Sequence, residues 1–332
     1  MRIILMGTGP FAVPSFEAIR AAGHETVAVF TRPMPAVKSR KGPPPAPVRQ
    51  WACEHRLAVF DPDSINDETV VDQLESLAAD LMVVCDYGQI LKAPALASTR
   101  LGGINLHGSL LPAYRGAAPV QRALLAGEPI TGVSVIHMTP RLDGGPILAT
   151  QKTEIDPKET AGQLEERLSA LGVPAVVDSL AILQSWDGES VIGEVQDPDA
   201  VTKAPRLHKS EAEIDWTATC KQIDCLVRGM QPWPIAFTQV VTRPDKPPVR
   251  VAVKRVASIT LDNDDPESQR NRDLAPGDIA WGDGFRIRCG DGVLVLDRIQ
   301  PAGKREMDGE EFVRGHRLKP GLSILDDKTP SS

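Results

Sequence analysis

The chain has 332 residues, of which 42% are hydrophobic and 24% charged, and its net charge is −7. This length suits two domains with separate cores, and the composition is that of an ordinary globular protein. The acidic balance argues against a protein that coats nucleic acid broadly, although it is compatible with a local basic patch. No apolar run reaches the ~18 residues that a membrane span needs.

The N-terminal residues begin a strand directly, with no secretory signal ahead of it, which predicts a cytoplasmic location. The five cysteines form no CxxC pair and their number is odd, so a disulfide framework is not expected. The six histidines show no zinc spacing, and the sequence therefore predicts no metal.

The first half of the chain alternates apolar strand-like runs with helical segments, which predicts an α/β fold with a doubly wound, mostly parallel sheet. The run at 81–85 is apolar throughout, as expected of a strand that is covered on both faces. One or two helices are expected over 161–183, broken near Gly172 and Pro174. The other expected elements are strands at 2–6, 26–30, 104–107 and 133–138 and a helix at 14–22.

A proline-rich segment at 31–48 follows the second expected strand. So many prolines exclude regular structure. A long loop in a compact domain is usually functional or disordered, and this one carries the basic cluster Lys38, Arg40 and Lys41.

The second half changes character after residues 189–205, which are rich in Asp, Gly and Pro and are expected to form a linker. A helix at 219–229 precedes short strands at 236–241, 249–256, 285–289 and 293–299, with a hairpin turn signal at 290–292. These features predict a small antiparallel barrel. The expected divisions are a first domain at 1–188, the linker at 189–205, the barrel at 206–318 and a disordered tail at 319–332.

Residues two apart on a strand point to the same face, so Asn105 and His107 should project together where the strand at 104–107 ends. A neutral amide beside a titratable imidazole can stabilise and reprotonate a tetrahedral acyl-transfer intermediate. Asp143 lies in a glycine-flanked loop, and near His107 its carboxylate would orient the ring and favour its charged form.

Two other motifs suggest different functions, and each is incomplete. Residues 7–12 fit G-x-G-x-x-A, a weak dinucleotide fingerprint, but Arg32 stands near the end of the second strand where an acidic residue is expected. Ser109 with His107 and Asp143 would suit a hydrolase triad, but the nucleophile-elbow pattern G-x-S-x-G is absent.

The motifs Asn105-Leu106-His107, Ser109 to Gly116 and Leu142-Asp143 resemble the signature of the 10-formyltetrahydrofolate-dependent formyltransferases. The resemblance continues over about 2–318. It implies a doubly wound domain with folate at its cleft and a C-terminal barrel similar to an OB-fold. Further matching runs lie at 79–81, 87–88, 117–123, 131–133, 214–216, 232–234 and 300–307.

This resemblance implies transfer of a formyl group from 10-formyltetrahydrofolate to the α-amine of methionine on initiator tRNA, in translation initiation. Asn105, His107 and Asp143 would be the catalytic residues. The expected partners are the initiator methionyl-tRNA and the folate co-substrate, with no membrane, and the expected state is a monomer. Folate would contact Ser109, Leu110, Leu111, Pro112 and Gly88, and tRNA would contact Lys38, Arg40, Lys41, Lys203, Arg206 and Lys209.

The chain departs from the family pattern at three positions. Arg141 stands where a small residue is common, Gly144 replaces a threonine, and Leu125 replaces a tryptophan. Two alternatives stay open: a sugar-nucleotide N-formyltransferase, which would share the Asn-His-Asp centre, and a non-catalytic RNA-binding protein that uses only the barrel.

Overall fold

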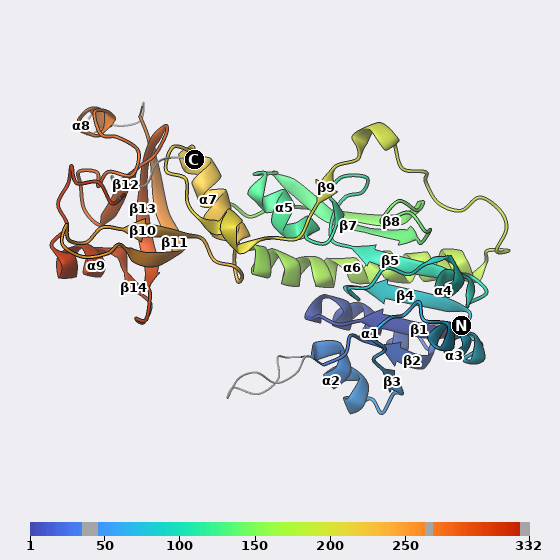
Figure 1. The fold of residues 1–332 in the computed structure, drawn as a ribbon. Helices are drawn as coiled ribbons and strands as arrows, with labels where there is room; N and C mark the ends of the chain where they lie inside the picture. Colours follow the sequence, from blue (N-terminus) through green and yellow to red (C-terminus); the bar gives the residue numbers. More distant parts are fainter. Residues whose placement is uncertain (35–45, 263–267, 326–332) are drawn as a thin grey trace. The chain divides into compact units, whose positions relative to one another are not determined.

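The computed structural model describes residues 1–34, 46–262 and 268–325 (Figure 1). The chain forms two compact units. The first unit comprises Met1–Val120, Pro129–Ile155 and Gln163–Arg206, and the second comprises Gln121–Glu128, Asp156–Gly162 and Leu207–Ser332. None of the helices in the described ranges is long and apolar enough to cross a membrane.

The first unit is built on a seven-stranded sheet with the order β3-β2-β1-β4-β5-β7-β8. Its first five strands are parallel, whereas β7 and β8 run antiparallel to their neighbours. The predicted doubly wound, mostly parallel sheet is therefore confirmed. The strands are β1 (Arg2–Gly7), β2 (Glu25–Phe30), β3 (Val59–Phe60), β4 (Leu81–Cys85), β5 (Gly103–His107), β7 (Ile130–His137) and β8 (Ile147–Glu154).

Helix α6 (Ala161–Gln184) is continuous, so the break that the sequence predicted near Gly172 and Pro174 does not occur. A Cβ atom at Gly172 would lie 2.7 Å from a methyl carbon of Leu106 in β5, so the missing side chain lets the helix approach the sheet closely. The buried residues of α6, such as Leu168 and Leu180, supply the apolar burial that offsets the hydrogen bond lost at Pro174.

Four more helices accompany the sheet within the described part of the first unit, and α5 links the two units along the chain. Helix α2 begins at Pro47, inside the segment that was predicted to lack regular structure, because proline is tolerated in a first helical turn. Lys38, Arg40 and Lys41 lie outside the described residues. The helices are α1 (Val13–Ala21), α2 (Pro47–Glu54), α3 (Glu68–Ser76), α4 (Ala93–Ala97) and α5 (Pro119–Leu125).

The second unit contains a five-stranded antiparallel sheet, as the sequence predicted for the C-terminal half. Its core includes Trp216, Phe285 and Phe312. Helix α7 (Cys220–Gly229) begins with a capping box between Thr219 and Gln222. The remaining elements are β10 (Phe237–Val240), β11 (Val249–Leu261), α8 (Ser268–Arg272), β12 (Phe285–Arg288), β13 (Gly292–Pro301), β14 (Met307–Asp308) and α9 (Gly309–His316).

The expected tail at 319–332 is described only as far as residue 325. Ile324 is fully buried in the core of the second unit. The amide of Val241 donates to the Ile324 carbonyl at 2.8 Å, and the Ile324 amide donates to Gly277 at 3.0 Å. This part of the chain is therefore fixed to the second unit, and residues 326–332 lie outside the described ranges.

Candidate active site

Strand β5 presents Asn105 and His107 on one face, as the two-residue spacing predicts. It lies between β4 and β7, with Asn105 opposite Val84 and Ile136. His107 is buried, whereas Asn105 is half-buried. Within the described part of the chain, the side-chain amide of Asn105 makes no hydrogen bond. Its NH2 group and its oxygen are therefore both available to a ligand.

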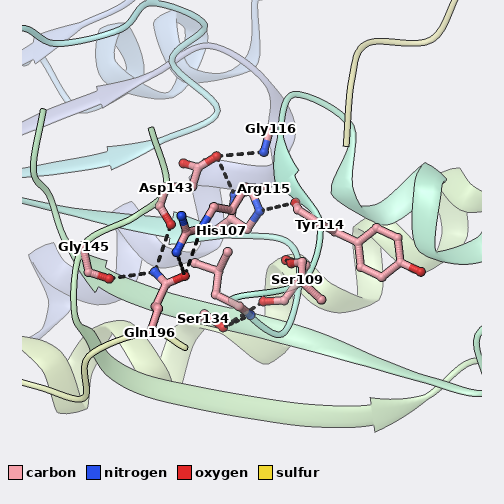
Figure 2. Close-up of polar contacts among 11 residues, drawn as sticks. His107, Ser109, Tyr114, Arg115, Gly116, Ser134, Asp143, Gly145 and Gln196 are labelled. Atoms are coloured by element: carbon pink, nitrogen blue, oxygen red, sulfur yellow. Dashed lines mark hydrogen bonds and ion pairs between the residues drawn. The ribbon is translucent and has the colours of Figure 1, made fainter. Parts of the chain in front are cut away.

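The His107 ring is held between the loop after β5 and the loop between β7 and β8 (Figure 2). Its Nε2 lies 2.9 Å from the carbonyl oxygen of Tyr114, and its Nδ1 lies 3.9 Å from Oδ2 of Asp143. A carbonyl oxygen only accepts, so Nε2 carries the hydrogen and the Nδ1 of a neutral ring does not. Nδ1, facing the Asp143 carboxylate, is therefore the atom that gains or loses a proton.

Asp143 is fixed by a backbone donor. Its Oδ2 accepts from the Gly116 amide at 2.9 Å, and its backbone has a left-handed φ of 46°. Gly116 itself has a φ of 132°, and a Cβ atom there would lie 2.5 Å from the carbonyl oxygen of Ala204. A glycine at 116 is thus required for the approach that holds Asp143 near His107.

Gln196 joins the two loops that flank the His107 ring (Figure 2). Its Oε1 accepts from the Arg115 guanidinium, at 3.0 Å from Nε and 2.6 Å from Nη2. Its Nε2 donates to the carbonyl oxygens of Asp143 at 2.9 Å and Gly145 at 2.7 Å. Gln196 and Arg115 are both buried, so this amide satisfies polar groups that water does not reach.

Thr202 and its neighbours also hold the loop that follows β5. The Arg115 amide donates to the Thr202 carbonyl at 2.9 Å, and the Tyr114 amide donates to Oγ1 of Thr202 at 2.8 Å. Strand β6 (Arg115–Gly116) pairs with β9 (Lys203–Ala204). The sequence analysis missed Gln196 and Thr202 because both fall in the expected linker, where no motif or periodicity distinguishes them.

The residues expected to contact folate after β5 form a tightly bonded turn. Ser109 is fully buried, and its hydroxyl donates to the Ala113 carbonyl at 2.7 Å. Ser134 of β7 donates to the Ser109 carbonyl at 2.8 Å and accepts from the Leu111 amide at 3.0 Å. Leu110 packs on Gly132, where a Cβ atom would lie 2.6 Å from Cδ2 of Leu110, and Pro112 is half-buried.

Gly88 lies in the loop after β4, apart from this turn in sequence but at the carboxyl edge of a neighbouring parallel strand. It has a φ of 78°, and its carbonyl oxygen lies 3.4 Å from Nη1 of Arg32. A Cβ atom at this position would lie 3.1 Å from Cδ of Arg32, so a side chain would crowd the arginine.

A carboxylate that the sequence analysis did not single out lies close to Gly88. The Asp86 residue is exposed as a whole, but its carboxylate is turned toward the amide of Gly9, where a Cβ atom would lie 2.0 Å from Oδ2. Burial of the carboxyl group raises the pKa of Asp86 to about 6, although the Gly9 amide opposes this shift. Burial raises the pKa of Glu165 in α6, and the nearby Asp86 raises it further.

The described basic residues that were expected to contact tRNA are all exposed. Lys203 and Arg206 belong to the first unit, and Lys209 belongs to the second unit. Across the described ranges, no group of three or more His, Cys, Asp and Glu side chains is placed to hold a metal ion.

Residues 1–180 match the formyl transferase family, and residues 206–317 match the formyl transferase C-terminal domain. Together with the sheet and the Asn-His-Asp arrangement, these matches define a formyltransferase that carries this C-terminal domain. A methionyl-tRNA formyltransferase from Rhodopirellula baltica is 58% identical over 98% of this chain and 97% of its own length. Another from Parvibaculum lavamentivorans is 38% identical over 98% of this chain and 100% of its own length. The chain belongs to the methionyl-tRNA formyltransferase family.

Solved structures share the fold at lower identity. The sugar 3N-formyl transferase WlaRD, in the presence of dTDP and 5-N-formyl-THF, matches with a TM-score of 0.62 and 14% identity over 92% of this chain and 99% of its own. HypX from Aquifex aeolicus in complex with tetrahydrofolic acid matches with a TM-score of 0.59 and 14% identity, over 100% of this chain and 50% of its own.

Proposed function

We infer that the chain transfers the formyl group of 10-formyltetrahydrofolate to the α-amine of methionine esterified to initiator tRNA, for translation initiation. The observation that carries this inference is the 58% identity to a methionyl-tRNA formyltransferase over nearly the whole of both chains. The sugar formyltransferase alternative rests on structures that are 14% identical, and such a likeness supports only the fold. The intact Asn-His-Asp centre argues against a protein that only binds RNA.

The reaction makes one principal demand on the protein. The attacking α-amine has an ordinary pKa of about 8, so a useful neutral fraction exists near neutral pH. The difficult species is the tetrahedral oxyanion that forms when the amine attacks the formyl carbon. We assign its stabilisation to Asn105, whose amide has no hydrogen-bonding partner in the described part of the chain and lies at the end of β5 beside His107.

His107 is assigned the proton transfer. Because Nε2 is bound to the Tyr114 carbonyl, Nδ1 would take the proton that leaves the amine. The resulting imidazolium would face Asp143 across 3.9 Å, which stabilises its charge. The proton would then pass to the departing folate nitrogen, directly or through water, and the formyl–nitrogen bond of the folate would break.

The binding residues are proposed from their positions in the fold and from their charge. The turn Ser109, Leu110, Leu111 and Pro112, together with Gly88, would bind folate at the carboxyl edge of the sheet, where open α/β sheets take their ligands. Lys203, Arg206 and Lys209, with Lys38, Arg40 and Lys41, would contact tRNA phosphates, which position but do not specify. The domain limits, the monomeric state and the cytoplasmic location stay predictions.

The assay that tests this function compares two acceptors with one formyl donor. The purified chain receives 10-formyltetrahydrofolate with either methionyl-initiator tRNA or a dTDP-linked amino sugar, and the formylated product is identified by mass spectrometry. We expect formyl-methionine only, and uncharged initiator tRNA is the control. Formylation of the sugar with none of the methionine would instead establish the alternative.

A further inference from the structure

Arg141 is an exposed cation beside the candidate active site that the proposed mechanism does not use. It lies in the loop between β7 and β8, two residues before Asp143. Its backbone carbonyl closes a turn by accepting from the Gly144 amide at 3.1 Å. Within the described residues, its guanidinium makes no hydrogen bond or ion pair, so its donors are available to a ligand.

Gly144 determines where the side chain of Arg141 runs. A Cβ atom at Gly144 would lie 2.7 Å from both Cγ and Cδ of Arg141 and 3.2 Å from its Cβ. Any side chain at 144 would therefore displace the arginine stem from the surface of the loop. The departures from the family pattern at Arg141 and Gly144 are thus sterically linked, because the glycine leaves room for the arginine side chain.

The charges around this loop favour an anion. Arg115 is buried, and its guanidinium is bound by the neutral amide of Gln196. Burial lowers the pKa of Arg115, the positive charge of Arg141 lowers it further, and Asp143 raises it. The positive charges of Arg115 and Arg141 therefore repel each other, and Asp143, the carboxylate that acts on Arg115, already accepts from Gly116 through Oδ2 and faces His107.

We propose that Arg141 binds a backbone phosphate of the acceptor end of tRNA at the edge of the active site, and that Gly144 positions it to do so. This proposal rests on the proposed function. The methionine ester is separated from the phosphate of the terminal nucleotide by a single ribose, so a phosphate necessarily lies near the reacting amine. The planar guanidinium fork matches two phosphate oxygens, and Arg141 projects it from the loop that holds Asp143.

The first test is the variant Arg141→Ala. Arg56→Ala is its control, because Arg56 is also an exposed arginine of the first unit whose guanidinium makes no hydrogen bond within the described residues, and it is remote in sequence from the loop. Loss of one charge-assisted phosphate contact should raise KM for methionyl-initiator tRNA about tenfold and leave kcat little changed. The dependence of log KM on log salt should become shallower by about one unit. The KM for 10-formyltetrahydrofolate should not move.

A second test separates phosphate binding from loop structure. With methionyl-adenosine, which lacks phosphate, the wild type and Arg141→Ala should be equally fast. Gly144→Thr should raise the KM for tRNA by itself and add nothing to Arg141→Ala in the double variant. Compared with Arg141→Ala, the variant Arg141→Lys should recover part of the affinity for tRNA, because lysine keeps the positive charge but lacks the planar guanidinium group.

The outcomes distinguish this proposal from the function that it rests on. A wild-type chain that does not formylate methionyl-tRNA would overturn the function. An active wild type whose Arg141→Ala variant keeps the same KM for tRNA and the same salt slope would overturn only the phosphate contact. A raised KM for the folate alone would assign Arg141 to the folate glutamate carboxylates and would also overturn it.

Discussion

Asn105, His107 and Asp143 differ in how firmly the protein already holds them. His107 is bound through Nε2, and Asp143 is bound through Oδ2 to a backbone amide. Asn105 has no such partner in the described ranges, so its amide must be oriented by its place in β5 and by the substrate. The side chains of His107 and Asp143 are therefore oriented before binding, whereas the side-chain amide of Asn105 completes its hydrogen bonds afterwards.

The variants Asn105→Ala and His107→Ala test these roles. Removal of a donor aimed at the oxyanion typically lowers kcat by about 100- to 1000-fold, and we expect losses of this order. The free energy of unfolding should change little for Asn105→Ala, because no buried partner is left unpaired. Turnover at saturating substrates and urea unfolding are the two measurements.

Asn271 provides the contrasting control for these variants. It is buried in the second unit, where its Oδ1 accepts from the Trp281 amide at 2.8 Å. Asn271→Ala should therefore lower the free energy of unfolding and leave kcat nearly unchanged. Near-normal turnover in Asn105→Ala or His107→Ala would remove that residue from the mechanism.

At the scale of elements, the stretch from Glu194 to Ala204 forms part of the active-site structure. Glu194 and Ile147 exchange two backbone hydrogen bonds of 2.8 Å, after which Gln196 and Thr202 bind the two loops beside His107. The positions of Asp143 and of the Tyr114 carbonyl thus depend on residues that follow α6 in the chain.

Gln196→Leu should therefore affect stability and catalysis together. The change leaves the buried Arg115 guanidinium without this acceptor and two carbonyl oxygens without this donor, which should cost about 1–3 kcal/mol of unfolding free energy. Turnover should fall because Asp143 loses its support. Urea unfolding and kcat are measured beside Gln50→Leu, because the side-chain amide of Gln50 donates to the surface residue Glu54 at 3.0 Å and lies in α2, outside the active-site loops. Equal behaviour of the two leucine variants would contradict the role of Gln196.

The sequence allowed some elements to be predicted and concealed others for physical reasons. Strand β4 was predictable because it is buried on both faces and therefore apolar throughout. Edge strand β8 was missed because only one of its faces is partly covered. The continuity of α6 depends on packing against Leu106, which no local signal reveals. Asn105, His107 and Asp143 were recognisable as a motif, whereas Gln196 acquires its role only through contacts distant in sequence.

At the scale of the whole molecule, buried carboxyl groups link folding stability to pH. Asp86 has a pKa of about 6 in the folded chain, above its ordinary value of 3.8. At a pH between 3.8 and about 6, a carboxyl group whose pKa is raised by folding binds more protons in the folded state than in the unfolded state. Its contribution to stability is therefore fully present below about pH 4 and is lost as the pH rises through 6.

The variant Asp86→Asn removes this titration while its side-chain oxygen can still accept from the Gly9 amide. It should be more stable than the wild type at pH 7.5 and should show a smaller fall in stability between pH 4 and 6. Asp80→Asn is the opposite case, because the Arg2 amide lowers the pKa of Asp80, and that variant should lose stability at pH 7.5. The measurement is the urea midpoint of each variant from pH 4 to pH 7.5. Parallel curves for the wild type and Asp86→Asn would refute the link between ionisation of Asp86 and folding stability.

The return of residues 194–204 to the active site also constrains how this enzyme could be recombined with its relatives. A chimera joined at residue 189 would take its Gln196 and Thr202 from a foreign parent, and the backbone that binds Tyr114, Arg115 and Gly116 would have to match by chance. A junction at 206, where the C-terminal domain match begins, keeps both sides of the reaction centre from one parent. The C-terminal domain can therefore be exchanged intact only if the segment before it stays with the catalytic sheet.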